Sequence, residues 1–181
     1  MAATPRNYWM LAVSPAYYEA VRKHGLTVLG LAKTHKKRAQ RMEIGDRVLY
    51  FVTSELMFVA TATVSGTYFE DESPFFPEVS GGETYPFRVK TRPGIVLDKN
   101  HQLDGRLIAP RLDYVRRWTP ELWPLAFVDL LHLAPKADFL LLESEMKRAR
   151  RRPRPAHPFG RPVPNGEDFA CELDRSAAEA Y

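Results

Sequence analysis

Short apolar segments bounded by turn residues constrain the fold of this chain more than any other feature. Such segments are typical of β-strands, and four stand out: residues 8–13, 47–53, 56–64 and 85–91. Ser54-Glu55 joins two of them as a predicted hairpin. Strands that follow one another through short turns pair antiparallel and curve the sheet. We therefore expect an α+β domain built on a small, curved or closed, mostly antiparallel β-barrel flanked by helices.

Residues typical of helix ends, and an apolar face at helical spacing, predict two helices. Ser14 before Pro15 is a strong N-terminal pair, and Gly25 ends the helix that residues 15–23 would form. Residues 136–149 form the clearest helical pattern, with one apolar face made of Phe139, Leu142 and Met146. The pattern of residues 107–118 fits a helix and a loop equally well.

The remaining strand patterns are less regular. Residues 26–31 read as a strand, and Gly30 inside it indicates a bulge or a close approach by another group. Alternation over residues 57–64 predicts one face with Phe58, Ala60, Ala62 and Val64. Residues 68–86 read as an irregular loop, and a break at residues 92–94 is expected before the sheet resumes.

A short basic helix is predicted between two of the strands. Thr34 would cap it, with Ala39 and Met42 facing inward. Lys36 and Lys37 stand in its first turn, where the helix dipole disfavours cations. Helix stability does not explain that placement, so the charges indicate a binding partner.

Positive charge is concentrated near the C-terminus. Residues 146–166 hold seven basic residues and no acid, whereas residues 1–145 hold 18 basic and 17 acidic residues. The region is also rich in proline and lacks apolar periodicity, which is typical of disordered arms. We expect one domain over residues 1–149 and a basic, disordered tail over residues 150–181.

Composition and motifs exclude several classes. Cys171 is the only cysteine, so no internal disulfide and no multi-thiolate metal site can form. The longest uncharged stretch, residues 56–69, is shorter than the about 20 residues of a membrane span. With no apolar leader at the N-terminus, a soluble cytoplasmic protein is expected. Phosphate-loop, dinucleotide and nucleophile-elbow motifs are absent, and Asp129 with His132 lacks a third metal ligand. We therefore expect no metal, no cofactor and no enzymatic activity.

Five motifs in order resemble the EVE domain family. They are Tyr8-Trp9 followed by Ser14-Pro15, the basic run before residues 45–50 (GDRVLY), residues 68–71 (YFED), residues 85–90 (YPFRVK) and residues 133–139 (LAPKADF). Together they span residues 7–149. The resemblance implies a PUA-like fold related to YTH domains, which hold a methylated adenine in an aromatic cage. It also implies a nucleic-acid-binding module, for RNA or modified DNA, that accepts a modified or flipped base.

The resemblance also implies a pocket. Ser14 matches the polar position after the first strand, and Leu29, next to Gly30, occupies a position where the family usually has Trp. Phe75 or Phe76 falls near the second aromatic position of the cage. Lys33, His35 and Arg88 match basic positions at the mouth of the pocket. Backbone phosphates would contact Lys36, Lys37, Arg38, Arg41, Arg150, Arg151 and Arg152.

Each position has a structural alternative. Ser14 could serve as a helix cap and nothing more. Leu29 could be a core residue and Gly30 part of a bulge, and the two Phe residues could anchor the loop. Arg88 could form a structural ion pair, and the basic run could be a solvated helix.

Three other functions remain open. A binder of free nucleobases or nucleotides would use the same pocket, and an accessory subunit would bind a protein. An enzyme of unrecognised type has only Ser14, His35 and Arg88 as candidates. The sequence leaves the oligomeric state open.

Overall fold

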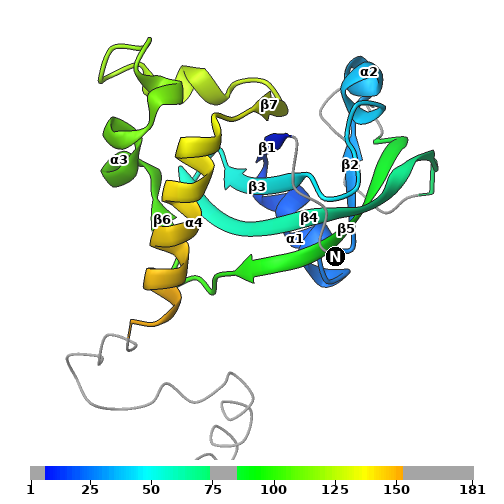
Figure 1. Ribbon diagram of the computed structural model, residues 1–181, viewed down its shortest axis with the longest axis horizontal. Helices are drawn as coiled ribbons and strands as arrows, with labels where there is room; N and C mark the ends of the chain where they lie inside the picture. The colour runs from blue at the N-terminus through cyan, green and yellow to red at the C-terminus, as the bar shows by residue number, and fades with distance from the viewer. Residues whose placement is uncertain (1–6, 74–84, 153–181) are drawn as a thin grey trace, which may run out of the picture.

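The computed structural model describes residues 7–73 and 85–152, and a curled seven-stranded sheet lies at its centre (Figure 1). The strands run in the order β2-β5-β4-β3-β1-β7, and β6 pairs with β4. Their bounds are β1 Tyr8–Val13, β2 Val28–Leu31, β3 Arg47–Val52, β4 Met57–Glu70, β5 Phe87–Val96, β6 Leu103–Asp104 and β7 Leu131–Leu133. The α-helices are α1 Pro15–Lys23, α2 Lys36–Ala39, α3 Gly105–Ile108 and α4 Lys136–Arg150. Short 3-10 helices cover Lys33–His35, Ala109–Arg111, Asp113–Val115 and Trp123–Phe127.

The sheet is mixed and open. β1 and β3 run parallel, because α1, β2 and α2 lie between them in the chain and allow β3 to run in the same direction. The other neighbouring strands pair antiparallel, as the hairpin of β3 and β4 does. The predicted α+β class with a curved, mostly antiparallel sheet is confirmed. β2 and β7 stand at the two ends of the strand order and do not pair with each other in the described residues.

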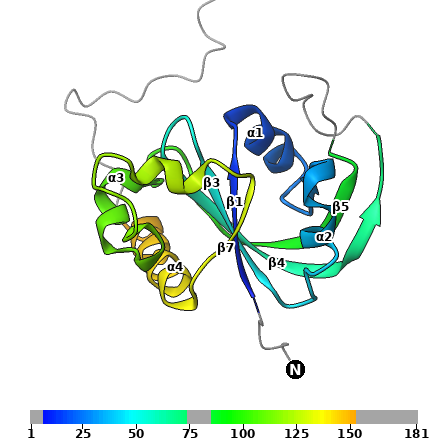
Figure 2. The same ribbon diagram turned by 90° about the horizontal axis from the view of Figure 1, so that it is seen from above.

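Helices cover both faces of the sheet. Figure 2 shows α1 and α2 on one side and α3 and α4 on the other. The buried residues accordingly form two clusters, and β1 contributes to both: Trp9 and Leu11 to the first, Tyr8 and Met10 to the second. All six residues of β1 are buried, which explains why this strand reads as a continuous apolar run rather than an alternation.

A bulge in β4 overturns one predicted face. The register of β3 and β4 shifts between Tyr50 and Phe51, so Phe58 turns toward the second cluster. There its ring centroid lies 4.7 Å from that of Phe51. Ala60 packs in the first cluster, together with Ala62 and Val64. The prediction that Phe58 shares a face with Ala60 is therefore wrong, because the extra residue reverses the alternation.

β4 and β5 are longer than predicted. β4 runs on to Glu70, and β5 passes through Pro93 and Gly94 without the expected break. Pro93 is accommodated where the ladder with β4 is irregular. A Cβ on Gly94 would lie 2.8 Å from the hydroxyl of Thr61, so the strands approach closely there.

The predicted helices form with small differences. The hydroxyl of Ser14 accepts a hydrogen bond from the Tyr17 N–H at 3.2 Å and caps α1. α4 buries Phe139, Leu142 and Met146, as predicted, and ends one residue beyond residue 149. Thr34 is not a cap: it lies within a 3-10 turn and contacts His35 Nδ1 at 2.9 Å. None of the helices in the described ranges has the length and apolarity needed to span a membrane.

Candidate nucleic-acid interface

A buried tyrosine fixes the backbone of Gly30. Tyr17, on α1, donates its hydroxyl hydrogen to the Gly30 carbonyl at 2.7 Å and accepts from the Gly30 N–H at 2.8 Å. Burial raises the pKa of this hydroxyl well above its ordinary value, so it remains a donor. Its ring also meets that of Tyr85 edge-on at 5.1 Å. Sequence analysis missed Tyr17; the only local indication is its place three residues after the cap.

Two predicted pocket residues have clear structural roles. The side chain of Leu29 is fully buried in the first cluster. Ser14 is exposed, with its hydroxyl engaged in the cap of α1. Phe75 and Phe76 lie outside the described residues.

Arg88 joins the two ends of the segment that contains those phenylalanines. Its side chain is 5% exposed, and its guanidinium donates to Asp71 at 2.6 Å and to the Ser73 hydroxyl at 2.8 Å. The Ser73 carbonyl accepts a further bond from it. Asp71 also donates its N–H to the Pro86 carbonyl at 2.8 Å. Hydrogen bonds from Ser73, followed by the charge of Arg88, hold the pKa of Asp71 below its ordinary value. Arg88 thus forms the ion pair that was one of its two alternatives.

The basic segment after β2 reaches the opposite edge of the sheet. His35 is 8% exposed, and its Nε2 lies 2.7 Å from Asp129. Arg38 donates to Asp129 at 2.5 Å and to the carbonyl of Leu131, in β7, at 2.6 Å. His35 and Arg38 therefore hold this segment in place, which a local sequence pattern does not reveal.

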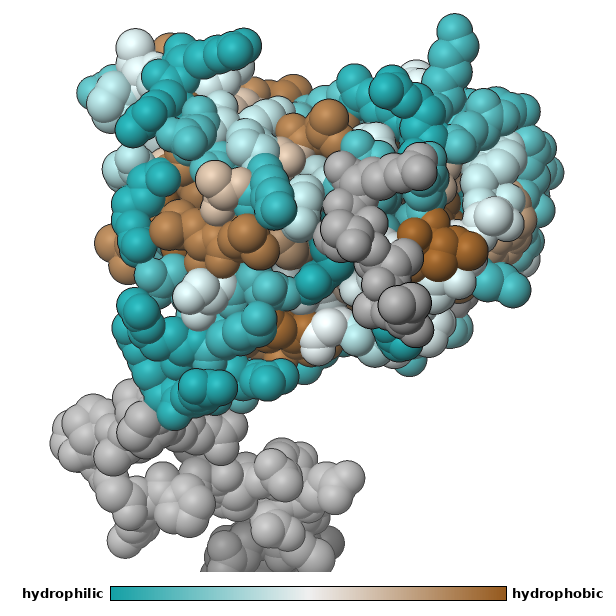
Figure 3. Space-filling model, in the orientation of Figure 1, coloured by the Kyte–Doolittle hydropathy of each residue, from teal (hydrophilic) through white to brown (hydrophobic). Residues whose placement is uncertain are grey.

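The other four cations of the segment differ in their contacts among the described residues. Lys36 pairs with Glu70 at 2.9 Å and lies over the ring of Phe87. Lys33, Lys37 and Arg41 are exposed, and none forms an ion pair within residues 7–73 and 85–152. Lys33 lies in the 3-10 turn, Lys37 in α2, and Arg41 two residues after α2. In Figure 3, hydrophilic residues cover the end of the molecule where α2 lies.

The predicted arginines at the end of α4 form a separate group. Arg150 is the last helical residue, Arg151 follows it, and all three arginines are exposed. The Arg152 carbonyl lies 3.1 Å from His101 Nε2. Figure 1 shows α2 and the end of α4 at opposite ends of the molecule, so these arginines do not extend the α2 surface. The tail beyond Arg152 lies outside the described residues.

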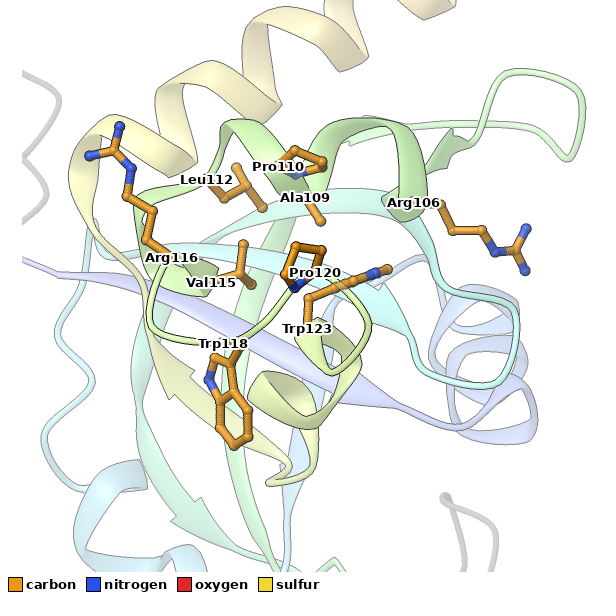
Figure 4. Close-up of a pocket in the computed structure, with 9 residues that line it drawn as sticks. All are labelled: Arg106, Ala109, Pro110, Leu112, Val115, Arg116, Trp118, Pro120 and Trp123. Atoms are coloured by element: carbon orange, nitrogen blue, oxygen red, sulfur yellow. The ribbon is translucent and has the colours of Figure 1, made fainter.

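A cavity of about 250 Å³ lies beside α3 (Figure 4). Its walls include Trp123, Pro110 and Pro120, whereas Arg106 and Arg116 extend away from it on opposite sides. Charged groups therefore do not converge on it. The described part of the chain also holds no group of three or more His, Cys, Asp or Glu residues that could bind a metal ion.

Comparisons with known proteins identify the fold and the family. The family model of the EVE domain matches residues 7–119. A UPF0310 protein of Pyrococcus abyssi is 25% identical over 149 residues, which cover 76% of this chain and 98% of the relative. A UPF0310 protein of Pyrococcus horikoshii is 26% identical over 150 residues, with 76% and 97% covered.

Solved YTH domains share the fold. The YTH domain of the Zygosaccharomyces rouxii MRB1 protein, in complex with N6-methyladenosine RNA, aligns with a TM-score of 0.56 and 15% identity. That alignment covers 81% of this chain and 92% of the YTH chain. The Mmi1 YTH domain aligns with a TM-score of 0.59 and 10% identity, covering 84% and 100%. At these identities, the similarity shows the fold alone.

Proposed function

Because this chain belongs to the EVE domain family, we propose that it is a nucleic-acid-binding module that accommodates a modified or flipped base. The base would enter beside β2, between α1 and the segment that Arg88 closes. RNA is the favoured ligand, since two of the YTH structures with this fold contain N6-methyladenosine. The protein would act by binding and would not be an enzyme.

The unpaired cations carry this proposal. Lys33 lies two residues after the end of β2, and Lys37 and Arg41 follow it within eight positions; each is exposed and without an ion pair among the described residues. Three neighbouring cations without acidic partners lower folding stability through mutual repulsion, and a chain of phosphates would remove that cost.

The base itself needs an aromatic face and polar groups for its edge. Tyr85 is half-buried beside Tyr17, and Phe75 and Phe76 follow Ser73 by only two and three positions. We propose that one of these two phenylalanines stacks on the base. Leu29 would leave that side of the pocket aliphatic, so binding would be weaker than in a full aromatic cage.

A binding screen tests the proposal. Single-stranded oligonucleotides with and without N6-methyladenosine would be titrated at 50 mM and 200 mM salt. The proposal predicts tighter binding of the modified strand and a steep loss of affinity with salt, as for a polyanion. Binding of a free nucleobase with almost no salt dependence would instead support a small-molecule binder. Cleavage of a strand by the purified protein would contradict the non-enzymatic role.

A further inference from the structure

A groove follows the outer edge of β7. It consists of two adjoining cavities, of about 230 and 410 Å³, whose walls share Tyr114 and Leu133. Arg38 and Arg41 line the first cavity, and Arg117 lines the second. We call it the β7-edge groove, defined by Arg38, Arg41, Tyr114, Arg117 and Leu133.

The groove is positively charged. Arg41 and Arg117, in the two cavities, are both exposed, and neither forms an ion pair with any residue that the structure describes. The nearby carboxylates already have partners: Asp113 pairs with Arg116 at 3.0 Å, and Asp129 with His35 and Arg38. Two guanidinium groups therefore remain available for an anionic ligand.

An aromatic ring lies between the two guanidinium groups along the groove. Tyr114 is half-buried, and its hydroxyl lies 2.8 Å from His132 Nδ1. Its ring centroid lies 5.7 Å from that of Phe127. These contacts fix the ring before a ligand arrives, so little further ordering is needed on binding. Exposed Leu133 adds an apolar contact beside it.

We propose that the β7-edge groove binds a single-stranded stretch of the nucleic acid, with phosphates at Arg41 and Arg117 and an unpaired base on Tyr114. A basic groove with a stacking ring is the common design of single-strand binding sites. This inference rests on the proposed function and extends it. The segment from Lys33 to Arg41 links the two sites, because it begins two residues after the end of β2 and ends in the groove.

An acidic peptide is less favoured as the occupant. A peptide that extended the sheet would need the outward carbonyl groups of β7. The carbonyl of Leu131 already accepts a hydrogen bond from Arg38. A nucleic acid needs no such ladder and uses the guanidinium groups and the ring instead.

The test compares two double variants of the full chain. Arg41→Gln/Arg117→Gln removes both groove charges, and Arg22→Gln/Arg92→Gln is the control. The control arginines are also exposed and without an ion pair in the described ranges. Arg92 is on β5, with β4, β3 and β1 between it and β7. Because all four side chains are exposed, both variants are expected to keep the wild-type melting temperature.

The readout is anisotropy of a fluorescein-labelled, twelve-nucleotide single-stranded RNA across a salt series. Each phosphate contact on a single strand contributes about 0.7 to the slope of log K against log salt, so the groove variant should lose about 1.4. If the wild type and the groove variant bind equally at 1 M salt, this difference in slope makes the variant bind about 25-fold more weakly than the wild type at 0.1 M salt. The control variant should lose less than half as much, and RNA carrying 5-iodouridine should cross-link to Tyr114.

Three results overturn the inference. If the wild type binds the RNA but the groove variant matches the control, the groove is not a nucleic-acid site, and the proposed function then rests on Lys33 and Lys37 without Arg41. If the wild type binds no oligonucleotide, both proposals fail. If a twelve-residue glutamate peptide binds as tightly as the RNA, and only the groove variant loses that binding, the groove is a protein-binding site.

Discussion

His35 and Asp129 are 94 positions apart in the chain, yet Nε2 of the imidazole lies 2.7 Å from the carboxylate of Asp129. Arg38 reinforces this contact through Asp129 and through the carbonyl of Leu131. Since His35 follows β2 and Leu131 is in β7, these side chains bridge the two edge strands, which do not pair with each other in the described residues. Side-chain contacts thus connect the two ends of the open sheet.

Removing the charge of Asp129 should loosen this bridge. Partial burial by itself raises the pKa of Asp129, but hydrogen bonds from Arg38 and His35 outweigh that effect and lower it. The stabilisation is therefore fully present above the unfolded value of about 3.9 and is lost as the pH falls through the lower, folded pKa. Asp129→Asn should lower the melting temperature at pH 7 and flatten its decline below pH 4. Glu55→Gln, at an exposed carboxylate, should leave both unchanged; an identical profile for the two variants would contradict the bridge.

Two neighbouring tyrosines on α1 should respond oppositely to loss of the hydroxyl. Tyr17→Phe leaves the N–H and carbonyl of Gly30 without their side-chain partner, which should cost about 1–3 kcal/mol of unfolding free energy. The hydroxyl of Tyr18 is buried with no partner in the described residues, so Tyr18→Phe should be neutral or slightly stabilising. Urea unfolding measures both. Wild-type stability of Tyr17→Phe would show that the Tyr17 contacts contribute nothing.

Arg88→Lys should separate loop closure from charge. A lysine keeps the positive charge but cannot reach Asp71, the Ser73 hydroxyl and the Ser73 carbonyl together. We expect a loss of about 1–3 kcal/mol in urea unfolding and weaker binding of the modified base. Lys90→Arg, on the exposed side of the same strand, serves as the control. Wild-type stability and affinity in Arg88→Lys would show that charge alone suffices.

The base and the phosphates should be separable by mutation. Phe76→Ala should cost about 1–3 kcal/mol of affinity for the modified oligonucleotide only, because a stacking surface is lost. Lys33→Ala should weaken modified and unmodified strands alike and reduce the salt slope by about 0.7. Oligonucleotide titrations with both variants check this. Unfolding of Phe76→Ala, or unchanged discrimination between the strands, would place the stacking residue elsewhere.

The basic tail should act as an electrostatic arm. Ending the chain at Ala149 removes Arg150, Arg151 and Arg152, and it should change the melting temperature by no more than about 3 °C, which corresponds to roughly 1 kcal/mol. Nucleic-acid binding should weaken uniformly across sequences, with a smaller salt slope. Replacing the three arginines by Gln in the full chain should reproduce most of the effect. A large loss of stability on truncation would show that the tail packs on the domain.

Local patterns predicted the elements that local chemistry determines. β1, α1 and α4 form over the predicted residues because the apolar residues of each element, and the cap of α1, are encoded within the segment itself. The bulge beside Phe58 could not be predicted, since it depends on how the paired strands β3 and β4 pack against the two hydrophobic clusters on opposite faces of the sheet. The partners of two ion pairs could not be predicted either: Asp71 for Arg88, and Asp129 for His35. Each pair joins distant segments, and no spacing rule connects them.

The division of the interior into two clusters has a consequence for how such a chain can diverge. The family match ends at residue 119, and the elements beyond it include α4, whose Phe139, Leu142 and Met146 lie in the second cluster. Tyr17 and Leu29 lie in the first cluster, across the sheet. Changes on the two faces should therefore combine nearly additively. One layer can be replaced over evolutionary time while the face that holds Gly30 stays under separate selection.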